Sequence, residues 1–270
     1  MSNLRRMLDI YLTQMKMAIM LEFQYRVANY FYMIGMITEP VIYLVVWSTI
    51  ARSQGGSVGG YTPGAFAAYY IVWTLVRNMN IVLTPYAWEG RIRRGQLSME
   101  LVRPLHPVHG DVAFFAGWKI VVIVLWLPLA LVLSLIFKPD LHPTWYQALA
   151  FFFAIWGAYL IRTMLLTLLG LITFWTTRVG AIFELFFAIE LVISGRLVPM
   201  SLMPEWVQRL AAYFPFQWTF GFPIEALTAG YTPAELLRGL GMQALWIGLG
   251  FVGVKVLWRF AVKQFSAVGG

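Results

Sequence analysis

The sequence contains no cysteine and few charged residues. The absence of cysteine excludes disulfides, thiolate zinc sites and cysteine nucleophiles. Charged residues make up 12% of the 270 residues, against roughly 25% in a usual soluble domain, whereas apolar residues make up 60%. This is too little polar surface to cover a water-soluble particle of this size. The chain is therefore predicted to be an integral membrane protein whose apolar excess faces lipid.

The common enzyme motifs are also missing. The sequence has no GxxxxGK[ST] phosphate loop, no HExxH and no GxSxG. His106 and His109 have a spacing that could suggest a metal site, but they flank Pro107 in a basic loop without cysteine, so surface histidines are the favoured interpretation. The net charge of +8 does not favour nucleic acid as a partner, because the basic residues form no continuous surface and lie between apolar runs.

Six apolar stretches are long enough to be membrane-spanning helices. Long continuous runs favour helices over the alternating strands of a barrel, and a spanning helix needs about 20 mostly apolar residues. We therefore predict an all-α polytopic membrane protein, a single domain over residues 1–270, that crosses a lipid bilayer six times. The predicted spans are 28–50, 64–86, 113–137, 147–175, 180–197 and 236–260.

The segment 1–26 has the pattern of an amphipathic helix. One stripe carries Arg5, Asp9, Thr13 and Lys16. Such a helix is expected to lie in the membrane interface, because a span follows almost at once; the alternative is a cytosolic helix packed on a partner. The opposite, apolar stripe consists of Leu4, Leu8, Tyr11, Met15 and Ala18.

The segment 198–233 is rich in proline and too irregular for another full span. It predicts two short helices, Met203–Tyr213 and Gln217–Leu227, the second dipping partway into the bilayer as a re-entrant piece. Lys and Arg are concentrated in 1–26, in the loop 87–112 and in the tail. Because positively charged loops stay in the cytoplasm, both termini are predicted to be cytoplasmic and 198–233 to form an extracellular cap.

Ionisable residues within the spans are costly and usually pair or face a watery cavity. Their depths suggest an ion pair between Glu39 and Arg77, and another between Arg162 and one of two glutamates on the fifth span. Structural pairing is favoured; the alternative is a polar lining for a substrate path or a proton relay. The five residues are Glu39, Arg77, Arg162, Glu184 and Glu190.

The loop 87–112 is the most informative stretch. Leu97 and Leu101 are one helical turn apart between Gly95 and Pro104, which predicts a short helix with its own start and stop. A short helix tied to the second and third spans has a shape that a soluble partner could push. The alternative is a plain solvated loop.

This loop resembles the cytoplasmic segment of the permease subunit in the type-2 branch of ABC exporters. The remaining order agrees: an interfacial N-terminal helix, six spans, and two short helices before the last span. Phe214-Pro215-Phe216 followed by Trp218 is similar to the Asn-Pro-aromatic stretch of that family, with Phe214 in place of the Asn. The matching loop residues are Glu89, Arg94, Gly95, Leu97, Leu101 and Pro104.

The resemblance implies ATP-driven export across a bacterial or archaeal cytoplasmic membrane. It implies two permease chains, identical or paralogous, resting on separate ATP-binding cassette subunits that hold ATP and Mg²⁺, so that this chain is not itself an enzyme and carries no cofactor. The implied coupling residues are Glu89, Arg93, Arg94, Gly95, Leu97, Leu101 and Pro104. The second and fifth spans would line the seam and the path.

Candidate lining residues are Trp73, Met79, Phe183, Phe186 and Phe187, for which lipid contact or helix packing is the alternative. The cargo expected for such a path is an amphipathic compound, drug, lipid or glycolipid. Two other functions remain open. A proton-coupled secondary transporter or channel would use the intramembrane Glu and Arg residues, and many such folds show inverted repeats, of which inspection finds none. An enzyme acting on lipid would need a convergent polar site, and no such constellation is apparent.

Overall fold

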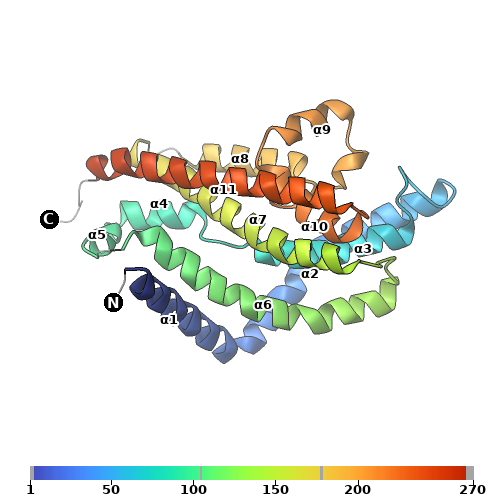
Figure 1. Ribbon diagram of the computed structural model, residues 1–270, viewed down its shortest axis with the longest axis horizontal. Helices are drawn as coiled ribbons and strands as arrows, with labels where there is room; N and C mark the ends of the chain where they lie inside the picture. Colours follow the sequence, from blue (N-terminus) through green and yellow to red (C-terminus); the bar gives the residue numbers. More distant parts are fainter. Residues whose placement is uncertain (1–2, 104, 177–178, 266–270) are drawn as a thin grey trace.

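The computed structural model describes residues 3–103, 105–176 and 179–265, and the regular elements of these residues are helices (Figure 1). This confirms the all-α membrane class. In the described part of the chain, four helices have the length and apolar composition of membrane spans. They are α2 (Arg26–Ser53), α6 (Pro107–Phe137), α7 (Trp145–Leu171) with its 3-10 extension to Phe174, and α11 (Pro233–Ala261) with its extension to Gln264.

The predicted second and fifth spans are shorter than expected, so six spans are not confirmed. α3 (Pro63–Met79) has 17 residues and α8 (Gly180–Ile193) has 14. At 1.5 Å per residue these helices are about 25 and 21 Å long, below the roughly 30 Å of a bilayer core. α3 ends at Met79, and it cannot run on into the next helix because Pro85 holds Thr84 in an extended conformation. α8 ends where Gly195 takes a φ of +83°.

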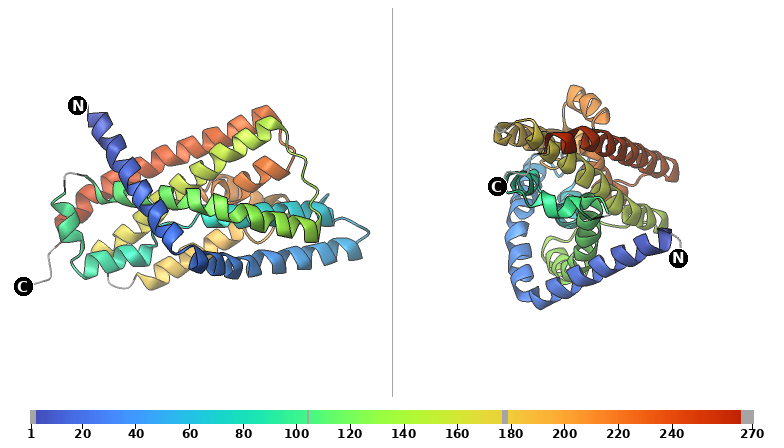
Figure 2. Two further views of the ribbon diagram at one scale, coloured as in Figure 1. Left: turned by 90° about the horizontal axis from the view of Figure 1, so that it is seen from below. Right: turned by 90° about the vertical axis from the view of Figure 1, so that its left-hand side faces the viewer.

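α3 lies inside the bundle and packs against α2, α6, α7 and α10 (Figure 2). From Phe66 to Met79, every side chain except that of Arg77 is buried. Tyr69, Tyr70 and Trp73 are among the largest fully buried side chains. α7 and α11 pack against each other over much of their length. The core therefore consists of aromatic and aliphatic side chains gathered around α3 and the inner face of α7.

α1 (Asn3–Gln24) lies against α6, and the chain turns at Tyr25 into α2. Tyr11 and Met15 are half-buried and Ala18 is fully buried, so part of the predicted apolar stripe packs on α6. The contact is close at Gly117, where an added Cβ would lie 2.4 Å from the Met15 carbonyl oxygen. Other apolar side chains of α1, such as Leu12 at 63% exposure, remain uncovered.

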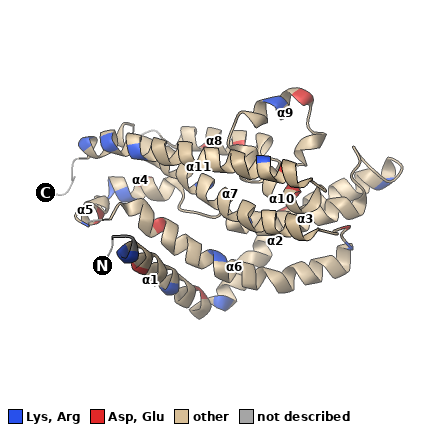
Figure 3. Cartoon of the chain, in the orientation of Figure 1, with Lys and Arg blue, Asp and Glu red and all other residues tan. Residues whose placement is uncertain are grey.

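The two ends of the bundle differ in charge. Both termini, α4 (Pro85–Arg93) and α5 (Leu97–Leu101) lie at one end, where Lys and Arg gather (Figures 1 and 3). The other end carries α9 (Glu205–Ala212), and α10 (Gly221–Thr228) follows in the same segment. α9 falls within the predicted piece Met203–Tyr213, and α10 overlaps the predicted piece Gln217–Leu227 and ends one residue beyond it. Their re-entry into a bilayer stays a prediction.

The contact at Gly117 generates the first prediction. Gly117→Ala should loosen α1, because the new methyl group meets backbone atoms of Met15 that cannot move aside. We expect a loss of about 1–3 kcal/mol, as for other overpacked sites. Thermal unfolding in detergent and proteolysis at Lys16 measure it. Gly110→Ala is the matched control on the same helix, because its Cβ would have no neighbour within 4 Å. Equal stability of the two variants would contradict the close packing of α1 on α6.

Candidate functional site

α4 is fixed to the bundle by one large side chain. Trp88 is fully buried, and α7 accommodates it at Gly170, where an added Cβ would lie 2.5 Å from the Cβ of Trp88. The predicted loop 87–112 is therefore wrong over α4, which is helical from Pro85 to Arg93. The signal for a helix was present in Thr84-Pro85, since Thr84 caps the helix through the Ala87 amide and Pro85 takes the first helical position.

A second attachment joins α4 to α6 through charge. The guanidinium of Arg91 donates to both carboxylate oxygens of Asp111, at 2.9 and 2.7 Å. It also lies 3.6 Å from Glu100 of α5. Burial raises the pKa of the Glu100 carboxyl, against the opposing effect of Arg91. Arg91 therefore connects α4, α5 and the first turns of α6 in one polar cluster.

The predicted coupling residues separate into buried and exposed positions. Leu97 is fully buried and Leu101 is half-buried, and both pack in a cluster with Trp88. Arg93 lies 2.8 Å from Glu89 and, like Arg94, is exposed. Gly95 adopts a φ of +68° that turns the chain between α4 and α5. Pro104 lies outside the described residues. The predicted short helix is α5, and its leucines face the protein.

The outward surface of this unit carries two apolar residues that sequence analysis did not single out. Met99 is 69% exposed and Val102 is 84% exposed. Their positions could have been found, because residues two apart from Leu97 and one beyond Leu101 point away from the leucine face of a helix. We define Met99 and Val102 with Arg93, Arg94 and Arg103 as the loop tip.

At bilayer depth, Glu39 of α2 lies between two arginines. Arg77 of α3 lies 2.5 Å from Glu39, and Arg196 donates to both oxygens of Glu39 at 3.2 Å. The Arg77 and Arg196 guanidinium groups also lie 5.2 and 5.8 Å from the centre of the Trp73 ring. The contact of Arg77 with Glu39 is predicted from the sequence, whereas that of Arg196 is not.

The second ion pair joins α7 to α8. Arg162 contacts Glu190, which is 1% exposed. Glu184, the other candidate partner, is exposed and accepts a hydrogen bond from the Tyr86 hydroxyl at 2.6 Å. Depth alone left both glutamates possible. The helical rotation between positions 184 and 190 decides, because it places Glu190 on the inner face of α8 and Glu184 on the outer face.

Lys119 is a buried charge that sequence analysis overlooked, although it lies within the predicted third span. Its side chain is fully buried, and its ammonium donates to the carbonyls of Asn78, at 3.0 Å, and Ile81. It also lies 4.4 Å from the centre of the Trp118 ring. The lysine thus satisfies backbone carbonyls at the end of α3, where the negative end of the helix dipole favours a cation.

A cavity of about 250 Å³ lies beside the arginines of the two ion-pair clusters. Its lining includes Arg77, Arg162, Arg196, Phe187 and Phe220. Phe186 is also half-buried, whereas Trp73, Met79 and Phe183 are fully buried and pack between helices in this chain. Of the predicted path residues, therefore, Arg77, Arg162 and Phe187 line this cavity. The path role of all of these residues stays a prediction.

The chain matches the ABC-2 family transporter proteins over residues 37–269. It belongs to this family. The ABC-2 family chain is thus a multi-pass permease subunit of an ABC transporter, and the family implies association with a membrane and with an ATP-binding cassette subunit. No curated protein matches the sequence. The matched range includes α4, α5 and the charged residues around the cavity.

The glutamate assignment generates the second prediction. Glu190→Gln leaves the Arg162 guanidinium without a counter-charge in a buried site, which should cost about 3–5 kcal/mol of stability. Glu184→Gln is the matched control and should cost less than about 1 kcal/mol, because an amide oxygen still accepts from Tyr86. Thermal unfolding in detergent compares them. Adding Arg162→Gln to Glu190→Gln should restore part of the lost stability. An equal loss in Glu190→Gln and Glu184→Gln would refute the pairing of Arg162 with Glu190.

Proposed function

We propose that this ABC-2 family chain forms the translocation path of an ATP-driven exporter, with ATP and Mg²⁺ bound by separate ATP-binding cassette subunits. The observation that carries this proposal is the unit α4–α5 within the family match. It is anchored to the bundle by Trp88 and Arg91, and it exposes the loop tip on the side that faces away from the bundle. A unit that is firmly held on one side and exposes apolar and basic residues on the other suits contact with a soluble subunit.

The distribution of charge supports a cytoplasmic position for the loop tip. The end of the bundle with both termini also carries Arg91, Arg93, Arg94 and Arg103 (Figure 3). By the positive-inside rule this end faces the cytoplasm, where ATP is available. The membrane would be the cytoplasmic membrane of a bacterium or archaeon, in keeping with the resemblance noted above. The segment 198–233 would then cap the outer end.

A second permease chain, identical or paralogous, would complete the path. α8 supports this arrangement better than α3, which is almost wholly buried within its own chain. An exposed apolar face on α8 is available for a partner and includes the exposed Glu184, a polar group that is costly against lipid. The residues of this face are Ile182, Leu185, Ile189 and Val192.

The cavity beside the arginines supports an amphipathic cargo. It combines guanidinium groups with Phe187 and Phe220, so that it offers both polar and apolar contacts.

The two ion pairs argue against a proton-coupled secondary transporter. Glu39 and Glu190 each contact arginine, and moving a proton through either would break an ion pair inside the membrane.

The test of this function is to purify the chain under mild detergent from its native membrane and to identify the proteins that remain bound. A stoichiometric ATP-binding cassette subunit and ATP hydrolysis by the purified assembly are expected. The number of permease chains in the assembly distinguishes a pair from a single chain. Absence of any nucleotide-binding partner under mild detergent would contradict the exporter and bring the secondary transporter forward.

The loop tip generates the third prediction. Val102→Asp places a charge on an 84% exposed residue, so the stability of the chain should change by less than about 0.5 kcal/mol. Association with the ATP-binding cassette subunit should weaken about tenfold or more, because the aspartate is desolvated at the contact. Co-purification and ATP hydrolysis measure this loss. Ser57→Asp is the control, because it adds the same charge to an exposed residue that follows α2 and lies outside the four candidate spans. Equal loss in both variants would exclude a specific role for the loop tip.

A further inference from the structure

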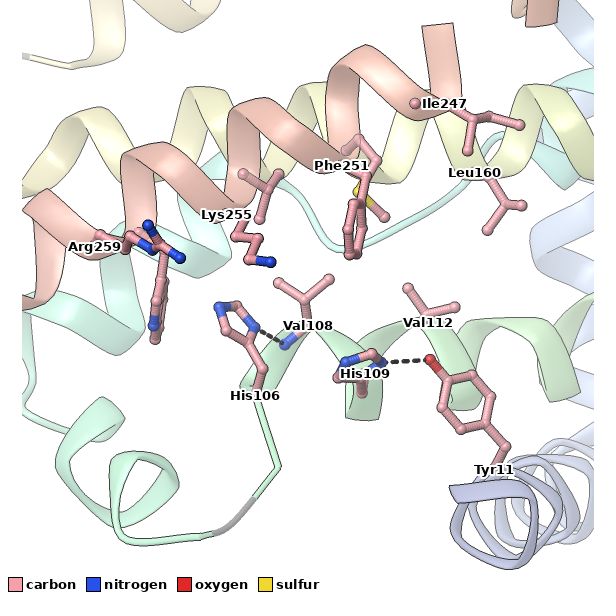
Figure 4. Close-up of a pocket in the computed structure, with 14 residues that line it drawn as sticks. Tyr11, His106, Val108, His109, Val112, Leu160, Ile247, Phe251, Lys255 and Arg259 are labelled. Carbon is pink, nitrogen blue, oxygen red and sulfur yellow. Dashed lines mark hydrogen bonds between the residues drawn. The ribbon is translucent and has the colours of Figure 1, made fainter. Parts of the chain in front are cut away.

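A groove of about 570 Å³ opens beside α1, between the start of α6, the middle of α7 and the second half of α11 (Figure 4). None of the residues predicted for coupling or for the path lines it. Its volume falls within the range of roughly 300–1,000 Å³ found for small-molecule sites. The groove is therefore a feature separate from the cavity beside the arginines.

The groove has an apolar wall and a basic rim. Lys255 and Arg259, one helical turn apart on α11, supply the basic rim, and no carboxylate lines the groove. Among the described residues, neither of the two has an ion-pair partner. The apolar wall includes Val112, Leu160, Met164, Ile247 and Phe251.

The position of Lys255 indicates that the ligand of the groove carries a negative charge. It lies within a helix that is apolar enough to span a membrane, where an unpaired charge is costly. Figure 4 shows the side chains of Lys255 and Phe251 reaching from α11 toward the start of α6, across the groove. An anion seated between α11 and α6 would compensate this charge.

His106 offers a third polar contact at the same place. Its Nδ1 accepts from the Val108 amide at 3.3 Å, so the hydrogen of a neutral ring is on Nε2 and can be donated to a ligand. Burial lowers the pKa of His106 to about 4, which makes the ring neutral at pH 7. His109 is already engaged by the Tyr11 hydroxyl at 2.7 Å.

The surroundings show from where the ligand comes. On α11, the side chains of Leu249, Phe251, Val252 and Val256 are about half-exposed. In a membrane protein an apolar surface of this kind faces acyl chains. The groove therefore opens toward lipid, and its basic rim lies toward the end of the bundle with the two termini, where headgroups of that leaflet are found (Figure 1).

We propose that the groove is a binding site for an anionic phospholipid. The phosphate group lies against Lys255 and Arg259 and accepts from His106. One acyl chain occupies the apolar wall beneath Phe251. The site lies on the α1–α6–α11 side of the chain and stands independently of the transport function, since it rests on the groove and its unpaired cations alone.

The experiment measures lipid binding to the full-length chain, purified with any bound subunits, by native mass spectrometry. Phosphatidylglycerol and phosphatidylcholine of the same acyl composition are titrated separately. Phosphatidylglycerol should bind at least about tenfold more tightly, and the double variant Lys255→Gln, Arg259→Gln should lose about 30-fold in affinity for it. The control Arg52→Gln, Arg238→Gln removes the same charge from two exposed positions, one near the end of α2 and one near the start of α11. This control should bind phosphatidylglycerol as tightly as the unchanged chain.

A second variant keeps the charges and fills the groove. Gly248 lines the groove and has no neighbour within 4 Å of an added Cβ, so that Gly248→Phe should fold and exclude the acyl chain. It should weaken phosphatidylglycerol binding, and an excess of inorganic phosphate should not displace the lipid. Equal binding of the two lipids, unchanged binding in both groove variants, or displacement by phosphate alone would overturn the assignment.

Discussion

The hydrogen bonds from Lys119 to the carbonyls of Asn78 and Ile81 hold the point at which α3 breaks off inside the bundle. A backbone that leaves the helical pattern in a membrane loses its internal hydrogen bonds and finds no water to replace them. A buried ammonium at this position satisfies two acceptors, and Asn80 donates to the Thr219 carbonyl from the same turn. The break allows α4 to start in a new direction, and the placement of Trp88 and Arg91 follows from that direction.

The same constraint operates where α8 ends. The hydroxyls of Tyr69 and Tyr70 donate to the carbonyls of Gly195 and Leu197, at 2.6 and 2.8 Å, and the Gly221 amide donates to Ser194. Both irregular segments are thus fastened to α3 or its neighbours. Arg196 lies within the second segment, so these bonds also determine where its guanidinium meets Glu39. The hydrogen bonds that satisfy this irregular backbone therefore also position the ion pair between Arg196 and Glu39.

Hydropathy was sufficient to predict the long helices α2, α6, α7 and α11, because each is a continuous apolar run. It failed for α3, whose apolar run continues past Asn80 although the helix does not; the break depends on Pro85 and on Lys119, a distant residue. The short helix at Leu97 was predictable from local spacing. The choice of Glu190 over Glu184 and the contact of Arg196 with Glu39 depend on tertiary packing, which a single sequence does not contain.

Trp88 lodges at Gly170 on α7, whereas Arg91 is bound to Asp111 on α6. One short helix is therefore fastened to two long ones that are joined in sequence only by the link 138–144 at the far end of the bundle (Figure 1). In mechanical terms the arrangement is a pair of tongs. A force on α4 and α5 would rotate α6 and α7 about the distant link 138–144. The displacement would be largest near α4 and α5 and smallest at the link. A small push on α4 and α5 would then change the width of the bundle first at the end that carries them, and would leave the end with the link 138–144 in place.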